Sequence, residues 1–334
     1  MSEAQWLPIV FMCLVGLATL AYAILDGYDL GVGILLPIDD STQSKRDTMI
    51  ASIGPFWDAN ETWLVLAIGL LLIAFPEAHS IILKELYIPA TFMLISLILR
   101  GVAFDFRAKA LTMHRKHWDI CFKFSSLVTA LSQGYMLGRY VLGFSDAWAA
   151  IVFAIVSAFC VAAAYAFIGG AWLVMKTQGS LQIKSAYWAR RSAWLAASGI
   201  LLVSIINPFV SEHIYMKWFS FPQIFILFPI PLVCLSLFIL SDRYLRSVPH
   251  AEDFGCWIPF VCAAIIFFLC FQALGYSFYP YVIPGQLTVA EASSAPESLM
   301  FIFYGAAVVV PCILGYTIFS YRVFWGKARS LSYY

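Results

Sequence analysis

Long apolar runs, separated by short polar segments, dominate the chain. A helix needs about 20 apolar residues to cross a bilayer. Runs of that kind occupy residues 7–35, 50–75, 80–104, 119–143, 147–175, 193–210, 221–241, 256–278 and 298–324. Because no water reaches the bilayer core to bond exposed backbone groups, each run is expected to be an α-helix. The sequence therefore predicts an all-α, polytopic integral membrane protein with about nine transmembrane helices.

Composition supports this class and excludes others. Of the 334 residues, 62% are hydrophobic and 12% are charged, whereas a soluble domain usually carries about 25% charged residues. The net charge of +1 leaves no electrostatic footprint for nucleic acid. The 8 cysteines include no CxxC pair, so neither a disulfide framework nor a metal site is predicted. We expect a single integral membrane domain over residues 1–334.

Basic residues cluster in alternate loops, and this asymmetry predicts the orientation in the membrane. Cytoplasmic loops carry an excess of Lys and Arg. The basic positions that follow alternate runs are Lys45, Arg46, Arg107, Lys109, Arg115, Lys116, Lys176, Lys184, Arg190, Arg191, Arg243, Arg246, Arg322, Lys327 and Arg329. The intervening segments 76–80, 143–148 and 281–298 lack Lys and Arg. The N-terminus is therefore expected outside and the C-terminus in the cytoplasm.

Ionisable residues gather at one level of the first three expected spans. They are Asp26 and Asp29 in the first span, Asp58 and Glu61 in the second, and Arg100 and Asp105 in the third. Asp58 is expected about eight residues, or roughly 12 Å, below the start of its run. Since consecutive spans are antiparallel, these residues are predicted to meet in the cytoplasmic half of the membrane.

Charges at this depth cost several kcal/mol unless they are paired, protonated or hydrated. Two carboxylates as close as those of Asp58 and Glu61 do not both ionise readily, so one is expected to hold a proton. The functional interpretation is a proton or ion route from the cytoplasm. In the structural alternative, Arg100 neutralises one carboxylate and the other charges lie at wet helix ends: Asp26, Asp29, Asp105 and Arg107. The neighbours Trp57, Asn60 and Trp63 are given supporting roles, the tryptophans as packing.

The histidines give a useful negative. They lie in expected loops or at span ends: His79, His114, His117, His213 and His250. A haem held between helices normally needs a His, Met or Cys ligand within the bilayer, and no histidine is expected there. The sequence also lacks the phosphate-binding loop of ATP-driven transporters and the common hydrolase motifs.

Several sequence blocks carry a resemblance to a known family. They are DGYDLGVGILLP at 26–37, GPFWDANETWL at 54–64, RGVAFDFRAK at 100–109, YSFYPYVIPG at 276–285 and YRVFWGK at 321–327. On these blocks the chain resembles subunit II of the cytochrome bd quinol oxidases from end to end. The shortness of the chain is similar to that of the cyanide-insensitive branch.

The resemblance implies a heterodimer in the inner membrane of bacteria. Subunit I would hold the b- and d-type haems and the quinol site, so this chain would bind no cofactor directly. Its helices would form two four-helix bundles plus one peripheral helix, with the first bundle over about 7–143 and the remaining helices over about 147–324. A structural quinone and a small accessory subunit stay open, as does the identity of the quinol.

In that family, protons for oxygen reduction are drawn from the cytoplasm along a path that crosses the subunit interface. The resemblance implies that Asp105 collects these protons and that Asp58 passes them to the partner. Matching blocks supply further polar groups for the path: Asp26, Asp29, Glu61 and Arg100. Two alternatives stay open from the residues alone. A proton-coupled transporter would usually show a matching polar set in its second half, and a purely structural scaffold would tolerate Asp58→Asn.

Overall fold

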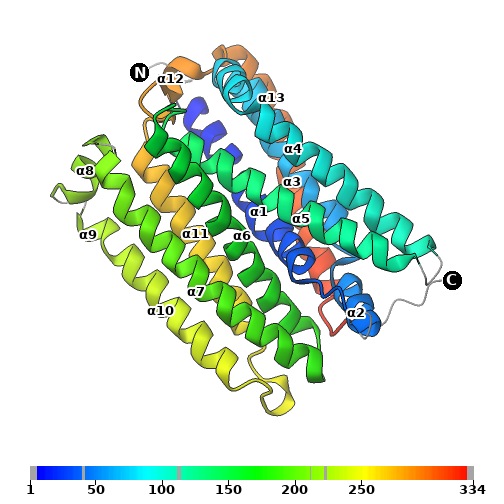
Figure 1. Cartoon of the computed structure of the whole chain (residues 1–334). Helices are drawn as coiled ribbons and strands as arrows, with labels where there is room; N and C mark the ends of the chain where they lie inside the picture. Colours follow the sequence, from blue (N-terminus) through cyan, green and yellow to red (C-terminus); the bar gives the residue numbers. More distant parts are fainter. Residues whose placement is uncertain (1–5, 40–41, 111–113, 211, 222–223, 329–334) are drawn as a thin grey trace.

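The computed structural model describes residues 6–39, 42–110, 114–210, 212–221 and 224–328. Long helices run side by side between two ends of the molecule (Figure 1). One end carries α2 and the other carries α12, and these are called the α2 end and the α12 end below. The expectation of an all-α chain is confirmed in its coarse form, because helices account for nearly all of the described elements.

The elements follow one another along the chain with short connections. They are α1 (Leu7–Leu35), α2 (Gln43–Ile53), α3 (Trp57–Ala74), α4 (Pro76–Lys109), α5 (Arg115–Val141), α6 (Trp148–Lys176), α7 (Gly179–Val210), α8 (Glu212–Phe219), α9 (Ile224–Leu227), α10 (Pro229–Arg246), the 3₁₀ turn η2 (Ala251–Asp253), α11 (Ile258–Phe278), β1 (Tyr281–Ile283), β2 (Leu287–Thr288), α12 (Val289–Ala292) and α13 (Pro296–Val323). The two short strands pair antiparallel, with Tyr281 opposite Thr288.

Among the described helices, 7 are long and apolar enough to cross a membrane: α1, α3, α4, α6, α7, α11 and α13. Two of the expected spans, 119–143 and 221–241, correspond to α5 and α10, which are outside this set. α5 carries polar residues along its length, among them Ser125, Thr129 and Gln133. α10 has three charged residues in its last five positions, namely Asp242, Arg243 and Arg246.

The expected run at 50–75 is wrong as a single helix. The structure divides it into α2 and α3, with Gly54–Phe56 as a turn between them. Pro55 causes the break, because it cannot donate a backbone hydrogen bond and its ring clashes with the preceding helical turn. Asp58 therefore lies in the first turn of α3 and not about eight residues into a continuous span. The run at 221–241 is also divided, into α9 and α10, and residues 222–223 lie outside the described residues.

Close contact between α1 and α6 sets the centre of the fold. A Cβ atom added at Gly31 would lie 1.8 Å from the backbone oxygen of Tyr165, and one at Gly169 would lie 2.5 Å from the backbone of Gly31. Only glycine permits backbones to approach this closely. The second half of α1, which carries Asp26 and Asp29, is consequently buried among its neighbours.

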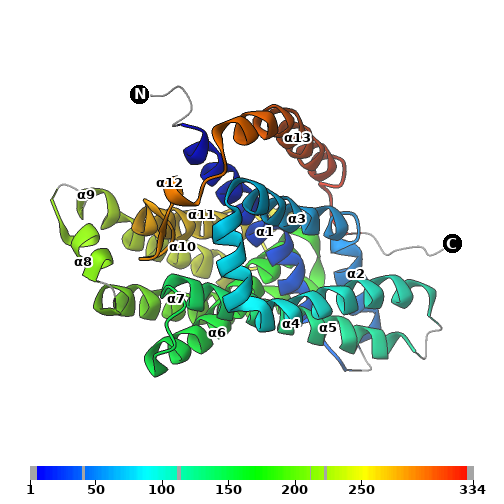
Figure 2. The same ribbon diagram turned by 90° about the horizontal axis from the view of Figure 1, so that it is seen from above.

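α13 lies at the edge of the bundle, as the view in Figure 2 shows. Its C-terminal end is nevertheless tied to α6. The ammonium group of Lys176 donates to the backbone oxygens of Trp325 and Gly326 at 3.0 and 3.1 Å. The side chain of Tyr321, one residue before Arg322, extends from this anchored end into the centre of the molecule and stacks on Phe56.

Candidate functional site

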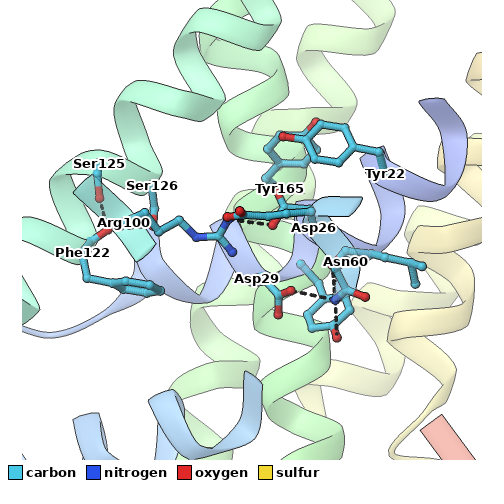
Figure 3. A network of polar contacts seen from close by, with 12 residues as sticks. Tyr22, Asp26, Asp29, Asn60, Arg100, Phe122, Ser125, Ser126 and Tyr165 are labelled. Atoms are coloured by element: carbon cyan, nitrogen blue, oxygen red, sulfur yellow. Dashed lines mark hydrogen bonds and ion pairs between the residues drawn. The ribbon is translucent and has the colours of Figure 1, made fainter. Parts of the chain in front are cut away.

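Arg100 on α4 is the centre of a buried ionic cluster. Its side chain is 0% exposed, and Nη1 donates to Asp26 Oδ1 on α1 and to Glu61 Oε1 on α3, both at 2.7 Å. Asp26 is also 0% exposed, whereas the Glu61 side chain is 26% exposed. Figure 3 shows the arginine extending between the helices toward Asp26. The predicted meeting of the first three expected spans is therefore real for these three residues.

Asp29 lies one helical turn after Asp26 on α1 and is held in place by Asn60. The Asn60 amide donates to Asp29 Oδ2 at 2.7 Å and to the Tyr28 hydroxyl at 3.0 Å (Figure 3). The Tyr321 hydroxyl donates to Asn60 Oδ1 at 3.3 Å, which brings α13 into contact with the site. We call Arg100, Asp26, Asp29, Glu61 and Asn60 together the Arg100 cluster.

The Arg100 cluster has more negative than positive side chains, and some of its buried atoms lack partners. Three carboxyl groups face one guanidinium. Several buried atoms have no hydrogen-bond partner among the described residues: Asp26 Oδ2, Asp29 Oδ1, Arg100 Nε, Arg100 Nη2 and, nearby on α5, Thr129 Oγ1. Buried polar atoms of this kind are usually satisfied by bound water. The arrangement is therefore suited to holding water and a mobile proton.

Aromatic rings cover the cluster at the α2 end. Tyr28 stacks on Trp172 with ring centroids 4.2 Å apart, and Phe56 stacks on Tyr321 at 4.6 Å. Asp29 is 0% exposed beneath these rings. The carboxylate of the cluster that does reach the surface is Glu61, so access from outside the chain is through the side of the bundle at α3.

Asp58 and Asp105 lie on the surface and not within the Arg100 cluster. Both are exposed, and neither makes a hydrogen bond or ion pair with another described residue. They follow directly after Trp57 and Phe104, whose rings pack together with centroids 4.8 Å apart. The two acids therefore occupy a similar level on neighbouring helices. The expectation that Asp58 lies about eight residues into its helix is wrong, because α3 begins only one residue before it.

The tryptophans that flank Asp58 and Glu61 are packing residues, as the sequence indicated. Trp57 rests on Phe104, and a Cβ atom added at Gly101 would lie 3.6 Å from its ring. Trp63 is 1% exposed and packs with Ala18, Tyr22 and Ala67.

A second buried ionic cluster, which the sequence analysis missed, lies nearer the α2 end. Arg46 Nε donates to Asp119 Oδ2 at 2.8 Å, Arg107 binds the other oxygen of Asp119, and Arg107 Nη2 donates to Asp47 at 2.6 Å. We call these four residues the Arg107 cluster. The prediction that Arg107 occupies a wet helix end is wrong, because its side chain is 1% exposed. α2 contributes to this burial, because its Arg46 and Asp47 bind Asp119 on α5 and Arg107 on α4.

The described histidines do not offer a buried ligand to a haem. His79 and His250 are partly exposed, and His114 and His117 are exposed at the start of α5. The His213 side chain lies outside the described residues. Across the described part of the chain, no group of His, Cys, Asp and Glu side chains is arranged to hold a metal ion.

Comparisons with known proteins agree on one family. The model of the family described as "Cytochrome bd terminal oxidase subunit II" matches residues 7–324. Cytochrome bd ubiquinol oxidase subunit 2 of Bacillus subtilis (strain 168) is 27% identical over 334 residues, covering 94% of this chain and 95% of the relative. Cytochrome bd-I ubiquinol oxidase subunit 2 of Escherichia coli (strain K12) is 26% identical over 371 residues, covering 98% and 96%.

A solved structure has the same fold. The bd oxidase from Geobacillus thermodenitrificans contains a chain that superposes with a TM-score of 0.78 at 16% sequence identity, covering 96% of this chain and 99% of that one. The likeness extends over nearly the full length of both chains, so the helices described above follow the same overall arrangement in both proteins.

Proposed function

The chain belongs to the cytochrome bd terminal oxidase subunit II family, and we propose that it delivers protons to a haem-bearing subunit I and stabilises that subunit. Membership makes it a multi-pass membrane subunit of a bd-type quinol oxidase, an oxidoreductase complex with a partner subunit I. The proposal places the α2 end in the cytoplasm of a bacterium, following the basic loops. It also includes about nine spans in two bundles, with α13 as the peripheral helix.

The carrying observation is the shortage of positive charge in the Arg100 cluster. One buried arginine contacts two carboxylates, and a third is held nearby by Asn60. At membrane depth, uncompensated carboxylates cost several kcal/mol each, and closely placed carboxylates share protons because they do not all ionise together. The cluster is therefore able to take up and release a proton without losing its arginine.

The surface acids supply the entry to this cluster. Asp105 and Asp58 are exposed near the α2 end, where they would gather protons from the cytoplasm. Glu61 lies one helical turn after Asp58 on α3 and contacts Arg100. In the proposed route, a proton passes from the surface acids to Glu61, which hands it across the exposed side of α3 to subunit I.

Exposed charge on a membrane helix also supports an interface at this face. α3 and α4 both have the length and composition of membrane spans, and lipid is a poor neighbour for Asp58 and Asp105. A polar surface of subunit I beside the two acids would reduce this cost and leave their cytoplasmic side open to water. The same contact would stabilise the partner, so one surface serves both parts of the proposal.

The two alternatives fare differently. Membership of an oxidase subunit family argues against a proton-coupled transporter. A structural scaffold without proton transfer is compatible with membership and is the alternative that experiment must exclude. The cyanide-insensitive branch, which chain length favours, stays a prediction.

The test is oxygen consumption by the purified two-subunit complex with excess quinol, measured for Asp58→Asn and for Glu61→Gln. The haem spectrum of each preparation gives the amount of assembled partner. Glu85→Gln is the matched control, because Glu85 is also an exposed carboxylate on a membrane helix but lies in the half of α4 nearer the α12 end. We expect turnover per haem to fall at least about tenfold in both test variants, a loss of roughly 1.4 kcal/mol, and to be unchanged in the control.

Each result has a separate meaning. Lost turnover with intact haems supports proton delivery. Lost haems in Asp58→Asn indicate that the acid holds the interface together, which supports only the stabilising role. Normal turnover in both test variants contradicts the proton path and favours the scaffold.

A further inference from the structure

A row of three hydrogen-bonded polar side chains, two of them buried and one half-buried, adjoins the Arg100 cluster on the side facing away from α2. It consists of Tyr22 on α1, Gln133 on α5 and Tyr165 on α6. The Gln133 amide donates to the Tyr22 hydroxyl at 2.6 Å, and the Tyr165 hydroxyl donates to Gln133 Oε1 at 2.7 Å. Tyr22 and Tyr165 are 5% and 4% exposed. Figure 3 shows both rings beside Asp26.

The hydrogen bonds among these three side chains all run in one direction, from Tyr165 through Gln133 to Tyr22. The Tyr165 hydrogen is used by the Gln133 oxygen, and the Gln133 amide occupies the Tyr22 oxygen as an acceptor. The hydroxyl hydrogen of Tyr22 is then left for another acceptor. Asp26 lies one helical turn after Tyr22, and its Oδ2 has no hydrogen-bond partner among the described residues. The Asp26 carboxylate is therefore the acceptor available to the remaining hydrogen of Tyr22.

Packing holds this arrangement in place. A Cβ atom added at Gly27 would lie 2.7 Å from Cε1 of Tyr165, so the tyrosine ring lies flat against a part of α1 that has no side chain. Toward the α12 end, residues 7–21 of α1 and 148–164 of α6 include no Asp, Glu, Lys, Arg or His. On α5, the next charged side chain after Gln133 is Arg139, which is 7% exposed and binds Asp146 and the backbone oxygen of Ser145.

We propose that Gln133 is a positioning residue that keeps Asp26 a carboxylate, so that Glu61 is the group that carries the mobile proton. This inference rests on the proposed proton path. Asp26 receives Arg100 on one oxygen, and the other oxygen, which has no hydrogen-bond partner among the described residues, is the acceptor we assign to the Tyr22 hydroxyl that Gln133 orients. Hydrogen bonds and an opposite charge both favour the ionised form of a carboxyl group. Glu61 shares the same arginine, lacks a second donor among the described residues and is 26% exposed.

The test uses infrared difference spectra of the assembled complex between its reduced and oxidised forms. A protonated carboxyl group gives a C=O band that an ionised one does not, so the band identifies the acid that changes protonation. In the unsubstituted complex we expect a band that disappears in Glu61→Gln and persists in Asp26→Asn. In Gln133→Leu, where Tyr22 is free to turn away, we expect a new band that disappears on adding Asp26→Asn.

Turnover gives a second readout through a double-mutant cycle. Tyr22→Phe removes only the hydroxyl group and keeps the ring, so it tests the same hydrogen bond if Gln133→Leu assembles poorly. We expect Gln133→Leu and Tyr22→Phe each to lower turnover per haem about tenfold. The variant with both substitutions should be no slower than the slower of the two single variants, because residues that act through one contact are non-additive. Ser132→Ala is the matched control on the same helix, and it should be normal.

The outcomes separate the two proposals. If Glu61→Gln is normal in turnover, the proton path itself fails. If Glu61→Gln is inactive while Gln133→Leu and Tyr22→Phe show the unsubstituted band and rate, only the role of Gln133 fails. A band in the unsubstituted complex that disappears in Asp26→Asn also overturns it, since Asp26 would then carry the proton. Additive losses in the double variant would make Gln133 a packing residue.

Discussion

Two buried ionic clusters, which meet on α4 and otherwise come from different helices, differ in charge balance. The Arg107 cluster joins two arginines to two aspartates, and each guanidinium has a carboxylate partner within hydrogen-bond distance. The Arg100 cluster has one arginine for three carboxyl groups. Buried atoms without partners occur in the Arg100 cluster and, among the described residues, not in the Arg107 cluster.

The difference in charge balance indicates that the Arg107 cluster stabilises the fold, whereas the Arg100 cluster can take up a proton. A balanced, saturated ion-pair network loses stability when one member is removed, but it gains nothing from taking up a proton. An unbalanced cluster changes its charge more easily, because a proton relieves the repulsion between its carboxylates. We therefore expect substitutions in the Arg107 cluster to act on stability and substitutions in the Arg100 cluster to act on turnover.

The largest effect is expected for Asp119→Ala. This change leaves Arg46 and Arg107 buried without their shared carboxylate, which should cost about 3–5 kcal/mol of stability. Thermal unfolding of the purified complex measures the loss, and oxygen consumption per haem should stay normal below the unfolding temperature. A complex that melts normally but turns over slowly would reverse the assignment of the two clusters.

Next in size is Arg100→Met, which removes the only cation of the Arg100 cluster. We expect turnover per haem to fall about a hundredfold, or roughly 2.7 kcal/mol, because the carboxyls would then hold their protons too tightly to release them. Oxygen consumption normalised to the haem spectrum measures this. Arg100→Lys keeps the charge and serves as the control, and it should recover part of the rate. Turnover close to normal in Arg100→Met would mean that the Arg100 cluster only stabilises the fold.

Much of this contrast could be predicted from the sequence. The boundaries of α1, expected over 7–35, match Leu7–Leu35, because a membrane helix is specified by a continuous apolar run. The meeting of Asp26, Glu61 and Arg100 follows from the antiparallel order of consecutive spans. Asn60, taken as a supporting residue, proves to be the link between Asp29 and Tyr321.

The rest depends on contacts between distant segments. Asp58 was expected about eight residues into its helix because the run at 50–75 was interpreted as one helix, although Pro55 in the same run already indicated a break. The burial of Arg107 and Asp119 could not be predicted, because charges near a helix end are usually wet and only the packing of α2 covers them. Tyr22, Gln133 and Tyr165 come from three separate helices, and no spacing in the sequence relates them.

A smaller effect is expected for Asp29→Asn, which should lower turnover without lowering thermal stability. The amide keeps the shape but removes one excess negative charge from the Arg100 cluster. We expect turnover per haem to fall about tenfold, because less repulsion remains to keep a proton in the cluster, a change equal to one pKa unit or about 1.4 kcal/mol. Thermal stability should be equal or higher. A stability loss as large as that of Asp119→Ala would erase the distinction between the clusters.

The smallest effect is expected at Asp253 in η2. This carboxylate has hydrogen-bond and ion-pair partners but is not deeply buried, so it serves as the reference for the two buried clusters. Gln182 donates to it at 2.8 Å, and Lys327 lies 3.2 Å away. The hydrogen bond from Gln182, with help from Lys327, lowers the pKa of Asp253 from its ordinary value. A lowered carboxyl pKa contributes stability above the unfolded pKa of about 3.9, and this contribution is lost as the pH falls through the folded value. Asp253→Asn should therefore cost less than about 1 kcal/mol at neutral pH and nothing in strong acid, which unfolding at both pH values measures. If Asp253→Asn lowers the free energy of unfolding in acid as well, the shape of the side chain and not its charge matters at this position. Asp253 could then not serve as the reference for the charge-based comparison of the two buried clusters.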